Sequence, residues 1–434
     1  MNAGDIQGLG LRALSHFARS DIADRLRLRK PVERLLYQGS KSGFRLAGGA
    51  ARVFAPSSSG GRQRLPGRSD RGLFDLSLSD EQQMMRETLQ RFAADQLRPA
   101  AHAADHEARL PENLRAEAQA LGLAYYAVPE ALGGVASEQA TVTQMLAAED
   151  LAHGDFTLAA TLLAPIGVAN AITRWGSAEQ QARYLPTFAG EQPPVAAIAV
   201  AEARPLFNPV ALETTARRQG GDYLLQGSKS LVLAGQDAEL FIVAAQLDGR
   251  PALFIVEGGS TGLSFRESPA MGLKAAATVD MALDGVRVPA ANRLGEDDLD
   301  YQAFLDYGYL AWCALAVGTC QAVLDYVVPY CNERVAFGEP ISHRQAVAFM
   351  IADIAVEVDA MRMLTWRAAA LAEAGQPFHR EAYLARLLCA EKAMQIGTNG
   401  VQLLGGHGFT KEHPVERWYR DLRAVAIAHG GLHL

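Results

Sequence analysis

The apolar residues of this 434-residue chain change their spacing twice along the sequence. Up to about Leu185 they recur every three to four residues, which predicts helices. Short runs rich in β-branched and other apolar residues then occupy residues 195–295, which predicts strands. After Pro289 the helical spacing returns in three long segments, at residues 303–334, 343–374 and 379–404. The order predicts an α+β fold in which a β domain separates two helical domains.

Sequence signals for caps and turns mark where several of these elements begin and end. Ser79 followed by Gln82 is typical of a capping box, so a helix is expected to begin there. The Asp248-Gly249 pair lies between two strand-like runs and favours a hairpin. Strands are expected at residues 223–225, 231–233, 240–245 and 252–256. One helical stripe of segment 343–374 is apolar and is expected to face the core; it comprises Val347, Ile351, Ile354, Val358 and Met361.

Positive charge is concentrated at the start of the chain. Residues 1–75 hold 14 Lys and Arg against 6 Asp and Glu, whereas residues 76–434 hold 27 against 42; the balances of +8 and −15 give the net charge of −7. Residues 55–72 are rich in Ser, Gly, Pro and Arg, so we expect a flexible linker at residues 55–75 after a basic extension at residues 1–54. Three interpretations of the extension are open. It contacts an anionic lipid surface, it is a transit peptide, or it binds the acidic remainder of its own or a neighbouring subunit. Its aromatic residues are not interleaved with basic ones, which argues against nucleic acid.

Cysteine and hydropathy patterns argue against metal sites, disulfides and membrane spans. The four cysteines form no C-x-x-C pair, and none has a His or a second Cys at zinc-like spacing. No run of eighteen apolar residues occurs, and no stretch has the form of a secretory signal. Because 49% of the residues are apolar, the chain can bury a large core. We therefore expect it to fold unaided in the reducing cytoplasm.

Two features of the C-terminal third can meet a phosphate group. The glycines of the turn at residues 405–408 allow backbone N–H groups to approach a ligand closely, although the turn follows a helix and by itself is more typical of a helix C-cap. Arg334 can pair bidentately with a pyrophosphate, or it can form a surface ion pair with Glu333 or Glu339. The residues alone leave both alternatives open.

Several longer motifs together resemble the acyl-CoA dehydrogenase family. They occur in the family's order over residues 76–431 and read LSDEQQMMRETLQRFAADQLRPAA, LGLAYYAVPEALGG, WGSAEQQARYLP, VPAANRLGE, NERVAFGEPISHRQAVAFMIADIA and VQLLGGHGFTKEHPVERWYRD. The resemblance implies an N-terminal helical domain at residues 76–194, a central β-barrel-like domain at residues 195–297 and a C-terminal helical bundle at residues 298–434. It also implies an oxidoreductase of fatty acid and lipid metabolism, which desaturates an acyl-CoA thioester between its α and β carbons with hydride transfer to FAD.

In that family FAD lies between the β domain and the C-terminal helices, and a neighbouring subunit holds its pyrophosphate and adenine. The resemblance therefore implies a homo-oligomer, or a hetero-oligomer with another dehydrogenase-like chain. We call the positions that match this contact the FAD grip: Arg334, Phe337, Gln345, Gln402, Gly405, Gly406 and Gly408. Ala336 stands where the family commonly has Thr or Ser, and Pro329 is expected to kink the helix before Arg334.

The half of the FAD site that belongs to the chain's own cleft matches the family less well. The family loop T-E-P-x-A-G-S-D appears as AEARPLFNP at residues 201–209, where Ala201 and Glu202 fill the first two positions and only the Glu is kept. The family strand W-I-T corresponds to Leu231-Val232-Leu233, so an indole and, at Leu233, a hydroxyl donor are missing. We predict weak or absent flavin binding in this cleft, with FAD bound only at a shared or partner site.

The catalytic carboxylate of the family is also missing. The usual Glu aligns with His429, and the alternative Glu of some members aligns with Gly308. Desaturation needs a group that takes a proton from the α-carbon, and a neutral His429 can do so because imidazole has a pKa near 6.5. Three functions follow from the resemblance: a dehydrogenase with an unusual base, a catalytically silent subunit that completes the FAD site of an intact partner, and a flavin monooxygenase on the same fold.

Overall fold

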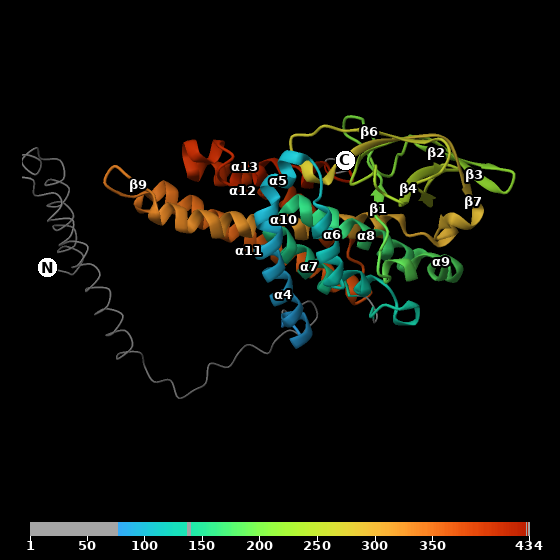
Figure 1. The fold of residues 1–434 in the computed structure, drawn as a ribbon, viewed down its shortest axis with the longest axis horizontal. Coiled ribbons are helices and arrows are strands. Elements are labelled where there is room, and N and C mark those ends of the chain that lie inside the picture. Colours follow the sequence, from blue (N-terminus) through green and yellow to red (C-terminus); the bar gives the residue numbers. More distant parts are fainter. Residues whose placement is uncertain (1–76, 137–139, 431, 433–434) are drawn as a thin grey trace, which may run out of the picture. The chain divides into compact units, whose positions relative to one another are not determined.

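The computed structural model of this chain describes residues 77–136, 140–430 and 432 (Figure 1). The predicted basic extension at residues 1–54 and the predicted linker at residues 55–75 lie outside the described residues. Within the described part, helices come first, strands follow, and helices return. The α+β order predicted from the apolar spacing is therefore confirmed.

The helices before the sheet begin at capping residues. The predicted capping box is present, because Ser79 Oγ accepts from Gln82 N at 3.1 Å and Gln82 Oε1 accepts from Ser79 N at 3.0 Å. Asp155 caps the apolar helix α8 by accepting from Leu158 N at 3.0 Å. The helices are α4 (Asp80–Phe92), α5 (Arg98–Glu107), α6 (Glu112–Ala120), α7 (Thr141–Gly154), α8 (Phe156–Trp175) and α9 (Ala178–Phe188).

The strands form one mixed sheet with the order β6-β7-β3-β2-β4-β5-β8, and β1 pairs parallel to β4. They are β1 (Ala196–Ala199), β2 (Thr215–Gln219), β3 (Asp222–Val232), β4 (Leu240–Leu247), β5 (Arg250–Glu257), β6 (Leu263–Glu267), β7 (Val279–Pro289) and β8 (Arg293–Leu294). Asp248 and Gly249, with φ of 51° and 81°, make the predicted hairpin turn between β4 and β5. Three of the four expected strand runs lie within β3, β4 and β5, and the fourth overlaps only the end of β3 because Leu233 follows it.

The sheet is open, so the barrel-like shape implied by the resemblance needs correction. β6 and β8 stand at the two ends of the strand order, and within the described part of the chain they do not pair with each other. A barrel requires hydrogen bonding to continue from one edge strand to the other. The spacing of apolar residues predicts strands but carries no information on whether two edges meet.

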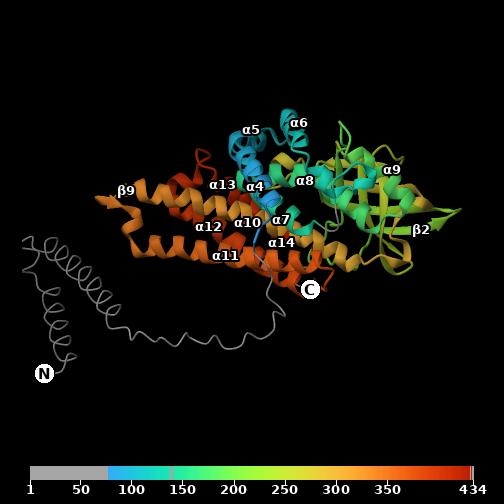
Figure 2. The same cartoon turned by 90° about the horizontal axis from the view of Figure 1, so that it is seen from below.

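The C-terminal helices are long and lie side by side (Figure 2). They are α10 (Tyr301–Glu333), α11 (Gln345–Glu373) and α12 (His379–Leu404), followed by the short α13 (Val415–Leu422) and α14 (Ala424–Ile427). These bounds confirm the three predicted long segments to within two residues. α10 continues through Pro329 to Glu333, and a small hairpin of β9 (Val335–Ala336) and β10 (Glu339–Pro340) joins it to α11. The predicted apolar stripe of α11 packs inward, with Ile354, Val358 and Met361 fully buried.

Strand β4 separates two apolar clusters and so ties the sheet to the helices. Leu240, Ile242 and Ala244 face a cluster that includes residues of α8 and α10, whereas Phe241 and Val243 face a cluster made by the strands alone. Alternation of side chains along a strand sends neighbouring residues to opposite faces. One face of β4 therefore forms the floor of the region where sheet and helices meet.

Two of these helices, α8 and α10, are long and apolar enough by length and composition to cross a membrane. Their most apolar stretches have mean hydropathies of 1.6 and 1.5, and 56% and 61% of the residues in those stretches are buried inside the fold. A helix that is buried on most sides carries apolar residues around its whole circumference. The composition of α8 and α10 thus agrees with their position in the core.

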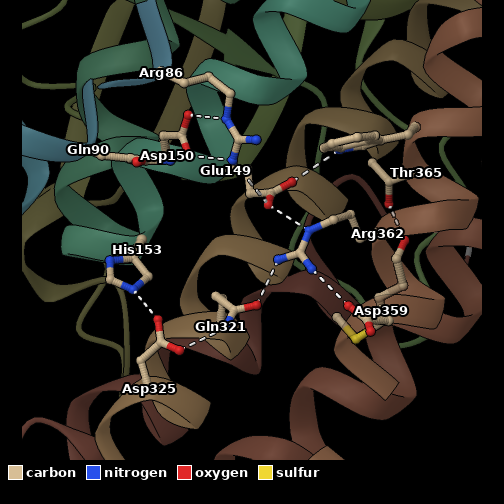
Figure 3. A network of polar contacts seen from close by, with 12 residues as sticks. Arg86, Gln90, Glu149, Asp150, His153, Gln321, Asp325, Asp359, Arg362 and Thr365 are labelled. Carbon is tan, nitrogen blue, oxygen red and sulfur yellow. Dashed lines mark hydrogen bonds and ion pairs between the residues drawn. The ribbon is translucent and has the colours of Figure 1, made fainter. Parts of the chain in front are cut away.

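A buried polar network holds α7 against α4, α10 and α11 (Figure 3). Arg86 of α4 donates to both carboxylate oxygens of Asp150, each at 2.8 Å. Arg362 of α11 donates to Glu149 at 2.8 Å and to Gln321 of α10 at 2.9 Å. Because each buried carboxylate has an arginine partner, the cost of removing its charge from water is offset. The network fixes the position of α7, whose other face lines the cleft described next.

Candidate active site

A cleft with a volume of about 180 Å³ lies where α7, α8 and α10 meet the sheet and the last turn of the chain. α8 and α10 form antiparallel walls, since Trp175 contacts Phe304 while Phe156 contacts Trp312. Most of the lining is apolar, and the side chains that bring polar atoms are Gln144, Asn170, Arg174, Trp175, Ser230, Tyr307, Trp312 and His429. A mainly apolar cleft with a few polar groups is typical of a site for a small organic ligand.

The structure brings the two positions of the missing carboxylate together. His429 lines the cleft, and its ring lies directly against Gly308 of α10. A Cβ atom on residue 308 would overlap Cε1 and Nδ1 of the His429 ring, so only glycine leaves room for the imidazole. Tyr309 and Trp312 flank the ring, with centroids at 6.2 and 6.5 Å. His429 thus lines the cleft, whereas its catalytic role stays a prediction.

The environment of His429 keeps its imidazole neutral. Burial, and to a smaller extent the positive charge of Arg386, together lower the pKa of His429 from 6.5 to about 4. Arg386 of α12 is buried, donates from Nη2 to Ala428 O at 3.1 Å, and lies with Cζ 3.8 Å from the centre of the Tyr309 ring. The His429 side chain is therefore uncharged at neutral pH.

A neutral His429 has a lone pair available but is a weak base. Its Nδ1 atom is buried and has no hydrogen-bond partner in the part of the chain that the structure describes. An unpaired imidazole nitrogen is able to accept a proton, as a general base does, although Nδ1 itself faces Gly308 of α10. Its low pKa means that the imidazolium formed would be disfavoured by burial and by Arg386. The arrangement therefore supports slow proton transfer.

The β-domain wall of the cleft offers few hydrogen-bond donors to a flavin. Ile198, Val200, Ala201, Leu231 and Leu233 line this wall, and the Ser230 side chain contributes its one hydroxyl. The faces of a flavin ring pack well against apolar side chains, but its nitrogen and oxygen atoms need hydrogen-bond partners. The side chains on this wall supply few donors to such a ring, and weak flavin binding in this cleft stays a prediction.

The carboxylate of Glu202 is occupied inside the β domain. It accepts from Lys229 Nζ at 2.8 Å and from the backbone N–H groups of Glu213 and Thr214 at 2.8 and 3.0 Å. Lys229 is buried, and desolvation lowers its pKa to about 8 although Glu202 acts in the opposite direction. The side chain of Glu202 therefore anchors the loop at residues 201–209.

The altered loop sends a bulky side chain toward the base. Phe207 is buried and packs against the backbone of Gly430, next to His429. Gly430 has a φ of 64°, and a side chain there would overlap Phe207, so glycine is required on both grounds. The aromatic residue that replaces the small residues of the family loop therefore holds the chain turn that presents His429.

The FAD grip residues gather at the opposite end of the helical bundle. Arg334 ends α10 and is exposed, and Phe337 in the following hairpin is 95% exposed. Gln345 begins α11 and is also exposed. The Tyr330 hydroxyl lies 2.7 Å from His407 Nδ1, which places the turn at residues 405–408 beside the end of α10.

Local geometry bears on the alternatives left open for these residues. Gly405 is the C-cap of α12, with φ 60° and ψ −130°, so the helix-cap interpretation is confirmed. A side chain on Gly405 or Gly406 would meet open space, so their backbone is also accessible to a ligand. Glu339 pairs with Arg344 at 2.9 Å, and in the described residues no carboxylate forms an ion pair with Arg334. Arg334 is thus available to an anion, and the role of the grip in FAD binding stays a prediction.

The grip and the cleft cannot serve one bound nucleotide in the same chain. Gly308 and Arg334 lie on the single helix α10, and a rise of 1.5 Å per residue separates them by about 39 Å. This separation exceeds the roughly 30 Å diameter of a small domain. Figure 1 shows β9, next to Arg334, at the far end of the long helices from the sheet. A nucleotide held by the grip would therefore lie away from this chain's own cleft, and binding to a neighbouring subunit's FAD stays a prediction.

Sequence reasoning missed two charged residues of the site. Arg386 interrupts the buried apolar stripe of α12 between Ala382 and Cys389, and a charge at such a position is a signal that was available. Arg174 lies in the last turn of α8, where a basic residue is common and gives no signal. Only the packing of α8 against α10 shows that it lines the cleft.

Comparison with known proteins agrees with this architecture. Family models described as the acyl-CoA dehydrogenase N-terminal, middle and C-terminal domains match residues 79–192, 197–286 and 300–432. The chain belongs to the acyl-CoA dehydrogenase family. It is similar to cyclohex-1-ene-1-carbonyl-CoA dehydrogenase of Geobacter metallireducens, with 32% identity over 366 residues that cover 81% of this chain and 95% of the relative. Acryloyl-CoA reductase (NADH) of Anaerotignum propionicum is also 32% identical, over 82% of this chain and 92% of that protein.

Solved structures of the acyl-CoA dehydrogenase family share the fold. Butyryl-CoA dehydrogenase from Megasphaera elsdenii superimposes with a TM-score of 0.76 at 30% identity, covering 83% of this chain and 97% of that one. Glutaryl-coenzyme A dehydrogenase in complex with glutaryl-CoA also gives 0.76, at 29% identity and with 83% and 94% covered. The predicted family and its helical, sheet and helical domains are confirmed.

Proposed function

We propose that this chain is an acyl-CoA dehydrogenase-type subunit that binds an acyl-CoA thioester in the cleft between α8 and α10. The observation that carries the proposal is the His429 ring packed against Gly308, because it places one neutral proton acceptor where both carboxylate positions of the family meet. The α-carbon of the thioester is expected to lie next to the His429 ring. The apolar walls exclude water from this position and receive the acyl chain.

FAD, when bound, supplies the hydride acceptor for the β-carbon. In this chain Leu231 and Leu233 would contact the ring, and Arg334 with the backbone of Gly405 and Gly406 would hold the pyrophosphate of a neighbour. His429 takes the α-proton, and Arg386 opposes the resulting charge, so we expect slow turnover. Proton transfer then sets the rate of desaturation.

An exposed apolar stripe on α11 supports an oligomer. Phe349, Val356 and Met363 follow each other at intervals of seven residues and are 62%, 67% and 38% exposed. Residues seven apart lie on one face of a helix, and such a face is usually covered by another helix. A neighbouring subunit against α11 provides the second chain that the FAD grip requires. We further propose that this assembly works in the cytoplasm, where the buried thiols stay reduced.

The second candidate is a catalytically silent subunit in a hetero-oligomer. The donor-poor wall around Leu231 and Leu233 favours it, because the chain keeps the residues that face a neighbour's nucleotide and lacks those that face its own. In this case the cleft contributes no turnover, and the grip completes the FAD site of an intact dehydrogenase.

One experiment separates the two candidates. The full chain is purified, its FAD is counted by absorbance, and oxidation of butyryl-CoA is followed with an artificial electron acceptor. One FAD per chain with turnover supports the dehydrogenase, whereas substoichiometric FAD with turnover only after addition of an intact dehydrogenase chain supports the silent subunit. Absence of turnover by the chain alone, together with no effect on an added intact dehydrogenase chain, contradicts both.

Matched variants assign each end of the chain. Replacing Arg334 by Met should lower FAD retention in the oligomer, because a bidentate contact with the pyrophosphate is lost. Arg287 is an exposed arginine of β7 paired with Asp222 at 2.7 Å, and its replacement by Met should leave FAD retention unchanged. Equal retention in the two variants would show that the grip is wrongly assigned.

A further inference from the structure

Arg174 places a positive charge in the cleft with no carboxylate beside it. Its Nη2 atom donates to Thr141 Oγ1 at 3.1 Å, and its Cζ lies 4.0 Å from the centre of the Tyr307 ring. Within residues 77–136, 140–430 and 432, no acidic side chain forms an ion pair with it. The side chain is half-buried, and burial lowers its pKa from the usual value. A guanidinium held in this way has an unmet demand for an anion.

The arginines around it are already paired. Arg174 lines both the cleft and an adjoining outer hollow of about 610 Å³. Arg183 and Arg293 line that hollow as well, and they pair with Glu257 and Asp297, each at 2.8 Å. Arg174 therefore stands at the passage between hollow and cleft as a cation without an acidic partner in the described residues.

The geometry leaves donors of Arg174 directed at a ligand. The guanidinium packs on Tyr307 and donates one N–H to Thr141, and a guanidinium carries five N–H donors in a planar fork that matches a carboxylate or a phosphate. Gln144 and Asn170, which line the same part of the cleft, satisfy each other through two hydrogen bonds of 2.9 Å. They do not compete for the anion.

Arg174 is also close to the reactive end of the cleft. It contacts Tyr307, and the next residue, Gly308, contacts the His429 ring. An anion on Arg174 and a carbon atom at His429 can therefore belong to one ligand. Arg174 lies in the last turn of α8, where a basic residue interacts favourably with the helix dipole. A side chain in solvent has the same interaction, so the dipole does not explain why Arg174 lines the cleft.

We propose that Arg174 binds an anionic group of the acyl thioester, which is either a carboxylate on the acyl portion or a phosphate of the CoA portion. The inference rests on the proposed function, namely that the cleft takes an acyl-CoA thioester. Arg174 then orients the ligand so that its α-carbon faces His429. The residue selects charged ligands over uncharged ones of the same size.

Binding of four thioesters to the full chain tests the inference by calorimetry. The ligands are butyryl-CoA, glutaryl-CoA, butyryl-pantetheine and glutaryl-pantetheine, which differ in whether they carry phosphates, a carboxylate, both or neither. Arg174→Met should weaken binding roughly 10- to 100-fold for the ligands whose anion Arg174 holds. A loss confined to the two CoA esters identifies phosphate, and a loss confined to the two glutaryl thioesters identifies carboxylate. Butyryl-pantetheine carries no anion and should bind both proteins equally.

Controls keep the test decisive. Arg287→Met removes a paired surface arginine and should leave all four affinities unchanged. If Arg174→Met does not fold, Arg174→Lys carries the same comparison, because lysine keeps the charge at the helix end and lacks the planar fork. Equal affinity of wild type and variant for every ligand overturns the inference alone. Failure of the wild-type chain to bind any of the four overturns the proposed function itself.

Discussion

The acidity of His429 offers the most direct check on the site. An unfolded chain protonates this side chain at its ordinary pKa of 6.5, whereas the folded chain does so only at about 4. Each pH unit between these values is equivalent to about 1.4 kcal/mol, so the difference amounts to roughly 3 kcal/mol of unfolding free energy. Because the unfolded state binds the proton first, this stability is present above pH 6.5 and is lost as the pH falls toward 4.

The pKa can be read directly by NMR of the chain labelled at histidine Cε1. The resonance of His429 is the one that disappears in His429→Gln, and it should keep the shift of a neutral ring down to about pH 5. Between pH 6.5 and 5 the wild type should lose about 2 kcal/mol of unfolding free energy more than His429→Gln. Arg386→Met should raise the pKa of His429, but by less than full exposure would, because burial is the larger cause. A His429 resonance that titrates at 6.5 or above would refute the placement of the ring in the cleft.

Three further predictions concern packing, the polar network and the base. Gly308→Ala should destabilise the wild-type protein by roughly 1–3 kcal/mol in urea unfolding, because the added Cβ overlaps the His429 ring. In a His429→Ala background the same substitution should stabilise the protein by up to about 1 kcal/mol. An effect of the same sign in both backgrounds would mean that the ring does not touch residue 308. Arg362→Met leaves the buried carboxylate of Glu149 without its partner at 2.8 Å and should lower the free energy of unfolding by about 3–5 kcal/mol. Adding Glu149→Gln should recover most of this loss. A loss below about 1 kcal/mol would show that Arg86 alone compensates the charge of Glu149. His429→Glu restores a carboxylate and should increase the rate of butyryl-CoA oxidation, so an unchanged rate would indicate that flavin binding, and not the base, limits turnover.

Much of the fold was predictable because local patterns decide it. The apolar spacing switches between helix and strand periods, and the resulting bounds of α10, α11 and α12 agree with prediction to within two residues. Ser79 and the Asp248-Gly249 pair act through contacts a few residues away, so their capping box and turn could be read from the chain. The openness of the sheet could not be predicted from the chain. Whether the edge strands β6 and β8 pair with each other depends on the whole strand order.

The candidate site was predictable in part. The alignment with family motifs indicated that His429 and Gly308 stand where carboxylates are usual, and the structure shows that these two residues touch. Phe207 was recognisable as a bulky replacement in the loop, although its contact with Gly430 was not. Arg386 and Arg174 escaped notice because each looks like an ordinary helix residue until α10 is packed against its neighbours.

The sequence by itself determined the order of helices and strands, the family, and the absence of an acid at the two expected positions. These properties reside in residue types and short spacings, which need no coordinates. Tertiary structure alone decided that the imidazole is neutral, that Phe207 supports it, and that about 39 Å of helix separates the cleft from the FAD grip. A pKa and a distance depend on atoms that the fold brings together from remote parts of the chain, so they appear only when the helices are packed.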